Sequence, residues 1–159
     1  MRKELPKLLI TGGAGFIGSA FIRLILKDPF VIARSEATKQ SHAKEIASAA
    51  CGSLAMTKQS NRVIPEIVII DKLTYAGDLK RLEEVKGKFK FYKTDICDKK
   101  QIESIFAKEK PDIAAHFAAE SHVDRSINNV SPFIDTNIKG TQVLLDVSRK
   151  HKISKFIFL

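Results

Sequence analysis

The sequence predicts an α/β protein in which helices cover both faces of a parallel, doubly wound sheet. Short apolar runs of strand length alternate with longer stretches whose apolar residues recur at helical spacing. Such alternation is typical of parallel sheets that are buried on both faces. Five strands are predicted, at residues 7–11, 67–70, 88–93, 113–117 and 155–159, with the order 3-2-1-4-5 across the sheet. Five strands make the first half of such a domain, so we expect the chain to be truncated.

Three helices are predicted between these strands. The first spans residues 16–27, with apolar positions at Ile17, Phe21, Ile22, Leu24 and Ile25. The second spans residues 99–108 after Asp98, a residue type that favours the N-cap. The third begins at Ser131-Pro132, because serine is a common N-cap and proline is favoured in the first turn. It is expected to reach about Lys150, with an inward face made of Phe133, Ile134, Ile138, Val143, Leu144 and Val147.

The segment from about residue 31 to residue 63 does not follow this alternation. It has no sustained strand pattern, and Ala37-Thr38-Lys39-Gln40-Ser41 returns as Met56-Thr57-Lys58-Gln59-Ser60. Asp71 follows Gly18 by 53 positions, whereas an acid follows the glycines of a dinucleotide-binding turn by about 20. We interpret the segment as an insertion between the first helix and the second strand, and a family-specific helical excursion is the alternative.

Composition excludes several classes of function. The net charge is +9, but the lysines are scattered among acids without a dense basic run, which argues against nucleic-acid binding. No apolar stretch approaches the roughly 20 residues needed to cross a bilayer, and the apolar run at the start is too short for a signal peptide. The two cysteines, Cys51 and Cys97, form no motif and favour a reduced, cytoplasmic protein.

A glycine-rich turn stands between the first strand and the first helix. Residues 11–18 read TGGAGFIG, with Gly12, Gly15 and Gly18 in a Gly-x-x-Gly-x-x-Gly pattern. A pyrophosphate needs backbone N–H groups aimed at it, which a helix N-terminus supplies, and a Cβ on the turn would hold it away. The sequence therefore predicts a Rossmann-type dinucleotide site.

Asp71 ends the second strand and is the predicted ligand of the adenosine ribose. A carboxylate there accepts hydrogen bonds from both ribose hydroxyls and repels a 2′-phosphate, which favours NAD over NADP. The neighbouring Lys72 would partly screen that repulsion. The alternative is that Asp71 only caps the strand.

Several strings resemble one family. They are TGGAGFIG, DKLTYAG at 71–77, DICD at 95–98, HFAAESHVDRSI at 116–127 and PFIDTNIKG at 132–140. Together they resemble the dTDP-glucose 4,6-dehydratases, a family of NAD-dependent enzymes in the extended short-chain dehydrogenase/reductase superfamily. The resemblance covers the chain apart from the surplus segment and a variable stretch at 78–90. It implies an N-terminal NAD-binding part, with NAD-dependent removal of water from dTDP-glucose to give the 4-keto-6-deoxy sugar.

The resemblance also implies a role for individual positions. Phe16 and Ile17 would lie against the pyrophosphate, and Asp95 and Ile96 would hold the adenine. The ribose of adenosine would be surrounded by Asp71, Lys72, Leu73 and Thr74. The nicotinamide-side ribose and phosphate would be lined by Ala118, Ala119, Glu120 and Ser121, with Thr136 completing the site. His122 would face the sugar nucleotide.

Other interpretations of these residues remain. Ala118 and Ala119 could be small only because a strand and a helix approach each other closely there. The alternation of Glu120, His122 and Asp124 suggests a metal site, but no second histidine or cysteine lies nearby in the sequence, so none is predicted. Thr136 could bond to its own helix backbone. His116, at an inward strand position, is interpreted as a core histidine.

No catalytic residue is predicted in this chain. The family uses a tyrosine base with a lysine four residues later, but Leu79 and Ile96 follow Tyr75 and Tyr92 at that spacing. The Thr-Asp-Glu run of the family, which follows the fifth strand, and the substrate domain are also not found. The isolated chain is therefore expected to be inactive. Another nucleotide-sugar dehydratase or epimerase, a non-catalytic remnant and a module that pairs with a second chain are the alternatives, and a homodimer stays open.

Overall fold

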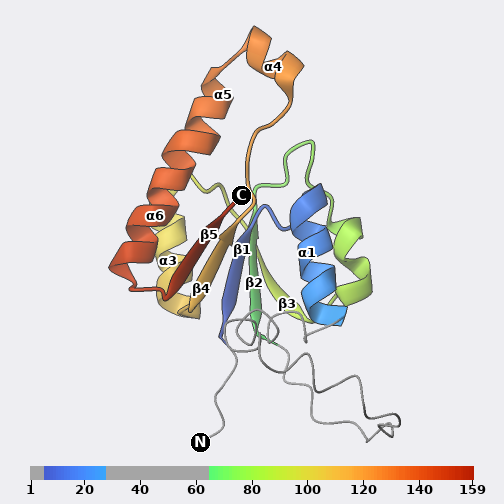
Figure 1. Cartoon of the computed structure of the whole chain (residues 1–159), viewed down its shortest axis with the longest axis vertical. Helices are drawn as coiled ribbons and strands as arrows, with labels where there is room; N and C mark the ends of the chain where they lie inside the picture. The colour runs from blue at the N-terminus through green and yellow to red at the C-terminus, as the bar shows by residue number, and fades with distance from the viewer. Residues whose placement is uncertain (1–5, 28–64) are drawn as a thin grey trace, which may run out of the picture.

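A five-stranded parallel sheet lies at the centre of the computed structural model, which describes residues 6–27 and 65–159 (Figure 1). The strands are β1 (Leu8–Thr11), β2 (Ile67–Asp71), β3 (Phe89–Lys93), β4 (Ile113–His116) and β5 (Lys155–Phe158). Their order is β3-β2-β1-β4-β5, and every neighbouring pair is parallel. This confirms the predicted fold class and strand order, and each predicted strand end lies within one residue of the observed one.

Helices cover both faces of the sheet, because successive strand residues point to opposite sides. One apolar cluster lies under α1 (Phe16–Lys27) and the 3₁₀ helix η2 (Leu79–Val85). The other lies under α3 (Lys99–Glu109) and α6 (Thr141–Lys150). Figure 1 shows the two helical layers on either side of the strands. Ile69 of β2 belongs to the first cluster and Ile70 to the second, and both side chains are fully buried.

The first two predicted helices are present. Asp98 is the N-cap of α3, as predicted, and its side chain accepts a hydrogen bond from the Gln101 amide at 3.1 Å. In α1 the buried apolar face is narrower than expected and is made of Ile22, Ile25 and Leu26. Two of the apolar positions by which this helix was predicted, Ile17 and Leu24, lie outside the buried face, since they are 60% and 50% exposed. Ile17 lies in the first turn of α1.

The third predicted helix is not a continuous α-helix. It consists of α5 (Ser131–Phe133), a π-helical stretch η3 (Ile134–Gly140) and α6. The predicted N-cap Ser131 lies inside the first turn, and its amide donates to the side chain of Asn129. The inward positions of α6 are buried as predicted, but Ile134 and Ile138 are 49% and 64% exposed. A π-helix shifts the helical phase, and this stretch projects past the sheet (Figure 1), so of its residues only Gly140 is buried in the described part of the chain.

Two short elements were not predicted. They are η2, within the stretch treated as variable, and α4 (Val123–Asn128), which buries none of its residues. Both elements are too short to show a repeating pattern of apolar residues, which explains why the sequence did not predict them. The predicted insertion at 31–63 lies outside the described residues. Among the described helices, none has the length and apolar composition that crossing a membrane requires.

Candidate functional site

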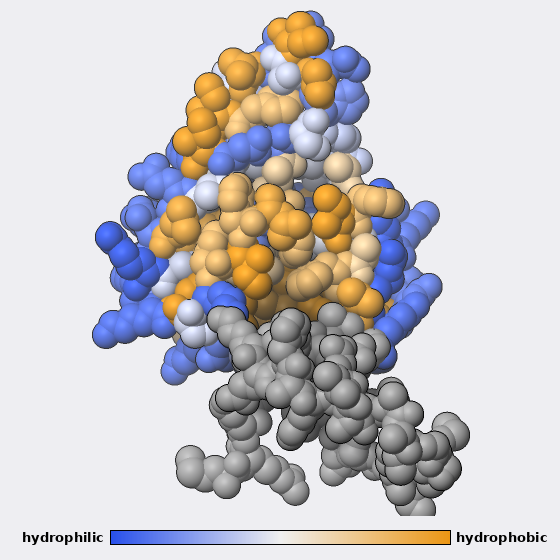
Figure 2. Space-filling model, in the orientation of Figure 1, coloured by the Kyte–Doolittle hydropathy of each residue, from blue (hydrophilic) through white to orange (hydrophobic). Residues whose placement is uncertain are grey.

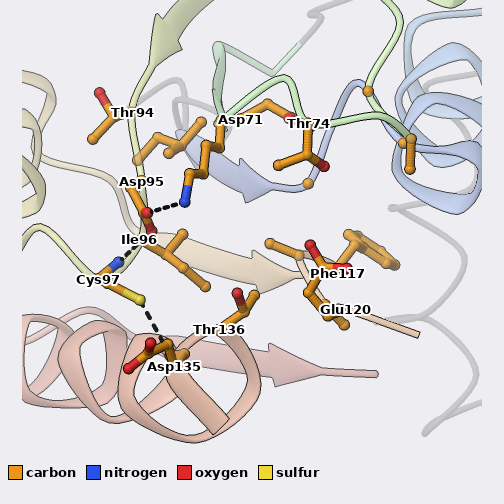
Figure 3. Close-up of a pocket in the computed structure, with 18 of the residues that line it drawn as sticks. Asp71, Thr74, Thr94, Asp95, Ile96, Cys97, Phe117, Glu120, Asp135 and Thr136 are labelled. Atoms are coloured by element: carbon orange, nitrogen blue, oxygen red, sulfur yellow. Dashed lines mark hydrogen bonds and ion pairs between the residues drawn. The ribbon is translucent and has the colours of Figure 1, made fainter. Parts of the chain in front are cut away.

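A cleft of about 420 Å³ opens where the strands end at their carboxyl termini. Figure 3 shows side chains from both halves of the sheet facing into it. Carboxyl ends of parallel strands at the point where strand order reverses are the usual place for a ligand in such sheets, and β1 and β4 meet here. The lining includes Gly12, Gly15, Asp71, Lys72, Thr74, Asp95, Ile96, Ala118, Ala119, Glu120 and Thr136.

Two glycines of the turn, Gly12 and Gly15, line this cleft, and the turn has no room for a Cβ at Gly12 or Gly18. Gly12 has a φ of +69°, a conformation that costs other residues free energy. A Cβ on Gly12 would lie 2.6 Å from the backbone nitrogen of Ala118, and one on Gly18 would overlap the carbonyl of Gly12. Gly18 is therefore a packing glycine that lies behind the cleft, and Gly12 lets β1 and the segment after β4 touch.

The N-terminus of α1 offers free donors beside this turn. In the described part of the chain, no protein group accepts a hydrogen bond from the backbone N–H of Phe16 or Ile17. The first-turn amides of a helix have no partner within the helix and carry a partial positive charge. The side chains of Phe16 and Ile17 are 80% and 60% exposed, so it is the backbone at these positions that could hold an anion.

Asp71 joins the end of β2 to the glycine turn. Its Oδ2 accepts a hydrogen bond from the Ala14 amide at 2.9 Å, and its Oδ1 accepts one from the Leu73 amide at 2.8 Å. Leu73 adopts a positive φ of 56° next to it. Each carboxylate oxygen has two lone pairs, so this capping role leaves acceptor capacity that faces the cleft.

Lys72 and Asp95 form an ion pair on the cleft wall, drawn as a dashed line in Figure 3. The Lys72 Nζ lies 2.6 Å from Asp95 Oδ2, and the hydrogen bond to Asp95 raises the pKa of Lys72. Burial acts to raise the pKa of Asp95, but the hydrogen bonds from Lys72 and from the Cys97 amide outweigh it and the pKa falls. The ammonium group of Lys72 is thus paired with Asp95, which limits its capacity to screen the negative charge of Asp71 from a 2′-phosphate.

Asn137 fixes the segment that follows β4. Its Oδ1 accepts from the Glu120 amide at 2.8 Å, and its Nδ2 donates to the Glu120 carbonyl at 2.9 Å. This pair of bonds is the kind that a neighbouring strand would make, so the side chain supplies the pairing that a free loop lacks. Asn137 lies in η3, where π-helical turns often mark functional sites.

Not every predicted site residue lines the cleft. Phe16, Ile17, Gly18, Leu73, Ser121 and His122 are not among the lining residues. His122 lies outside, with its ring 6.2 Å from that of Tyr75, and the Arg125 guanidinium lies 3.7 Å from the centre of the same Tyr75 ring. The described residues show no group of metal-ligating side chains around Glu120, His122 and Asp124.

Some lining residues were missed by sequence reasoning. They are Ile70, Ala76, Gly77, Thr94, Cys97, Phe117, Pro132, Asp135 and Lys139. Most of them are sequence neighbours of predicted site residues, and this proximity is the only feature of the sequence that pointed to them. The Cys97 thiol donates to the Asp135 carbonyl at 3.1 Å, and burial, followed by the nearby Asp95 charge, raises its pKa to about 11. Cys97 therefore stays a protonated thiol near neutral pH and joins the loop after β3 to η3.

His116 is a core residue, as predicted. It is 1% exposed and its two ring nitrogens lie 2.7 Å from Thr11 Oγ1 and 2.9 Å from Thr141 Oγ1. Burial lowers its pKa to about 4, so the ring is neutral near neutral pH. Thr141, and not Thr136, donates to the carbonyl four residues earlier, that of Asn137.

Comparison with known proteins agrees with the geometry of the cleft. A model of the NAD dependent epimerase/dehydratase family matches residues 8–159. The chain is 42% identical over 147 residues to a dTDP-glucose 4,6-dehydratase of Salmonella typhimurium, covering 91% of this chain and 31% of that protein. An Escherichia coli dTDP-glucose 4,6-dehydratase is 40% identical with the same coverage.

Solved structures show the same fold. The dTDP-glucose 4,6-dehydratase DesIV of Streptomyces venezuelae, solved with NAD and TYD bound, has a TM-score of 0.67 and 34% identity, covering 94% of this chain and 38% of that one. The UDP-Glc/GlcNAc 4-epimerase of Campylobacter jejuni has a TM-score of 0.70 and 27% identity, covering 97% and 36%. The chain spans about a third of the length of the curated relatives it matches. It belongs to the NAD dependent epimerase/dehydratase family.

Proposed function

We propose that this chain binds NAD in the cleft at the carboxyl ends of its strands. The observation that carries the proposal is a combination of three features: α1 amides that no group in the described part of the chain accepts from, glycines of the turn that line the cleft, and a carboxylate at the end of β2. A dinucleotide needs all three, for its pyrophosphate, for close backbone approach and for its ribose. The cleft, at about 420 Å³, has the size of small-molecule sites.

The residues of the cleft divide between the two halves of the dinucleotide. In this proposal Asp71, Leu73 and Thr74 hold the adenosine ribose, and Asp95 with Ile96 holds the adenine. The pyrophosphate lies on the amides of Phe16 and Ile17. The other ribose and its phosphate lie beyond β1, against residues 118–121 and Thr136. NAD would supply the hydride chemistry, and the chain would bind and orient it.

We propose that NAD is preferred over NADP. The Asp71 carboxylate stays close to the site of the ribose, because two backbone amides hold it there. A 2′-phosphate would meet this negative charge, and Lys72, the nearest cation along the chain, is already paired with Asp95. The preference therefore depends on Asp71 and only weakly on Lys72.

The reaction of the whole protein is proposed from its relatives. We propose dehydration of dTDP-glucose to the 4-keto-6-deoxy sugar, with this chain as the NAD-binding part and His122 facing the sugar nucleotide. Two curated dehydratases are 40% and 42% identical to the chain. Among the solved structures DesIV is 34% identical, a Bacillus anthracis dehydratase 26% and an epimerase 27%, and a UDP-glucose 4-epimerase has the same TM-score as DesIV, 0.67. Another nucleotide-sugar dehydratase or epimerase is the second candidate, favoured by that structural likeness.

By itself, the chain is proposed to bind NAD without turnover. Neither Tyr75 nor Tyr92 has a lysine four residues later, so the chain lacks the family's base. Incubation of the chain with NAD⁺ and dTDP-glucose, followed by measurement of the 4-keto product, tests this. Detectable product would contradict it.

The proposal on oligomeric state is a homodimer through the projecting part of the molecule. Val123, Ile127, Val130, Ile134 and Ile138 are 49–78% exposed there, and Figure 2 shows apolar surface over this region. Contiguous exposed apolar patches commonly mark interfaces. Sedimentation of the wild-type chain and of the Ile138→Lys variant tests the proposal, and a wild-type monomer would contradict it. A cytoplasmic location without a nucleic-acid partner completes the proposal.

Calorimetric titration of the full chain with NAD⁺ and with NADP⁺ is the central experiment. The wild type is expected to bind NAD⁺ more tightly than NADP⁺. In Asp71→Asn the NAD⁺ affinity should fall about tenfold and the discrimination against NADP⁺ should narrow, because one charge is removed. Asp146→Asn removes an acid of α6 that does not line this cleft and should bind as the wild type does. A folded wild type that binds no NAD⁺ would overturn the proposed function.

A further inference from the structure

Six polar contacts connect the glycine turn to the segment after β4 by way of the core. The Ala118 amide donates to Thr11 Oγ1 at 3.5 Å, and Thr11 Oγ1 lies 2.7 Å from His116 Nδ1. His116 Nε2 lies 2.9 Å from Thr141 Oγ1, which donates to the Asn137 carbonyl at 2.7 Å. The Asn137 side chain then bonds both backbone groups of Glu120. We call Thr11, His116, Thr141 and Asn137 the relay.

The direction of each bond in the relay follows from the donors available. The single hydroxyl proton of Thr141 goes to the Asn137 carbonyl, so Thr141 must accept from His116. His116 Nε2 therefore carries the ring proton, and in the neutral ring Nδ1 is an acceptor. Thr11 donates to that nitrogen and keeps lone pairs for the Ala118 amide. Every polar atom along the path is paired.

The relay holds residues 118–120 at both ends. Ala118 is fixed against Thr11 and against Gly12, where a Cβ would lie 2.6 Å from the Ala118 nitrogen. Glu120 is fixed by two bonds to Asn137. Between them Ala119 is exposed and lines the cleft. Figure 3 shows this wall, with Phe117 and Glu120, across the cleft from Asp71 and Asp95.

The two walls of the cleft thus depend on different supports. Asp71, Asp95 and Ile96 belong to the ends of β2 and β3, and none of their hydrogen bonds involves the relay. A dinucleotide that places its adenosine on that wall must place its second ribose against residues 118–120, since β1 and the glycine turn lie between the two. Through hydrogen bonds the relay therefore supports the wall made by residues 118–120, while the other wall meets η3 through the Cys97 thiol and the packing of Ile96 against Gly140.

We propose that the relay is a positioning device which fixes the backbone of residues 118–120 for the nicotinamide-side ribose and phosphate of NAD. This inference rests on the proposed function and adds residues to it, because none of the four was assigned to the site from the sequence. His116 and Thr141 do not line the cleft, so they act through the backbone that they hold. Their loss should weaken the binding of a whole dinucleotide and spare the binding of its adenosine diphosphate half.

Titration calorimetry with NAD⁺ and with ADP on the full chain tests the relay. Thr141→Val keeps the shape of the side chain but removes both hydrogen bonds, and Thr141→Ser keeps the hydroxyl. We expect Thr141→Val to weaken NAD⁺ binding about tenfold and ADP binding less than about twofold, with Thr141→Ser close to the wild type. Asn137→Ala, in a half-buried position outside the core, should give the same split and serves if Thr141→Val does not fold.

The outcomes separate the relay from the proposed function. Equal losses for NAD⁺ and ADP, or no loss of NAD⁺ binding in either variant, would overturn the relay while NAD binding stands. Failure of the wild type to bind NAD⁺ would overturn the proposed function and the relay with it. Nitrogen NMR of the His116 ring gives a further readout, because a neutral ring protonated on Nδ1 would contradict the bond directions.

Discussion

Acid should destabilise the folded chain through His116 before it titrates the buried carboxylates. Burial lowers the pKa of His116 from 6.5 to about 4, so the unfolded chain binds a proton more readily than the folded one. The free energy of unfolding therefore rises as the pH rises from the folded pKa to the unfolded pKa, and it decreases as the pH falls through the same range. The contribution of His116 to the free energy of unfolding has its full value above about pH 7.5 and decreases as the pH falls to about 4.

The size of the effect follows from the two pKa values. Between about pH 7.5 and about pH 5, the linkage relation gives a loss of about 2 kcal/mol for this one ring. With a typical urea dependence, that loss moves the unfolding midpoint by about 1 M. Glu109, whose pKa the hydrogen bonds from Tyr92 and then Lys90 lower to about 2, stays charged throughout this range and contributes little to the difference.

Urea unfolding followed by far-ultraviolet circular dichroism measures the effect in the wild type and in His116→Gln. The glutamine keeps a donor toward Thr141 but leaves Thr11 without its acceptor, so the variant should be less stable by about 1–2 kcal/mol near pH 7.5. The wild type should lose about 2 kcal/mol by about pH 5 and the variant, which lacks the titrating ring, should not, so the difference in stability should vanish or change sign there. Equal pH dependence in the wild type and His116→Gln would refute the reasoning.

Two further substitutions test the packing of the fold. Gly12→Ala should cost at least about 2 kcal/mol of stability, measured by thermal unfolding, since it adds a backbone clash with Ala118 to an unfavourable φ. Gly87→Ala shares the positive φ but meets open space, and equal costs for the two would exclude the clash. Tyr92→Phe removes a 2.6 Å hydrogen bond to the buried Glu109 and should cost about 1–2 kcal/mol near neutral pH. It should also raise the pKa of Glu109 in the folded chain. The stability that this carboxylate adds above its unfolded pKa of 4.5 should then be smaller, and it should be lost at a higher pH during acidification. An acid unfolding transition at the same pH as in the wild type would argue against the bond.

Local patterns were enough for the strands and for one wall of the site. Buried strands such as β2 are continuous apolar runs with a defined end, so both their extent and the acid that follows them can be read directly. The glycine spacing likewise predicts a turn that only backbone atoms can fill. Helix 131–150 was harder, because a period of 3.6 residues cannot reveal a π-helical stretch at Ile134–Gly140 or the absence of a core beside it.

The sequence by itself determined the α/β class and the acid that ends β2, because each depends on residues that are close along the chain. The strand order followed from the doubly wound class and not from a local pattern. Only the tertiary structure decided which groups meet. Asp71 reaches back 57 positions to the Ala14 amide, and Thr11 and His116 are joined across 105 positions. Hydrogen bonds between distant segments leave no periodic trace in a sequence, since each needs only one polar residue at the right place. The support of the second wall by Asn137 and Thr141 therefore became visible only once the strands lay side by side.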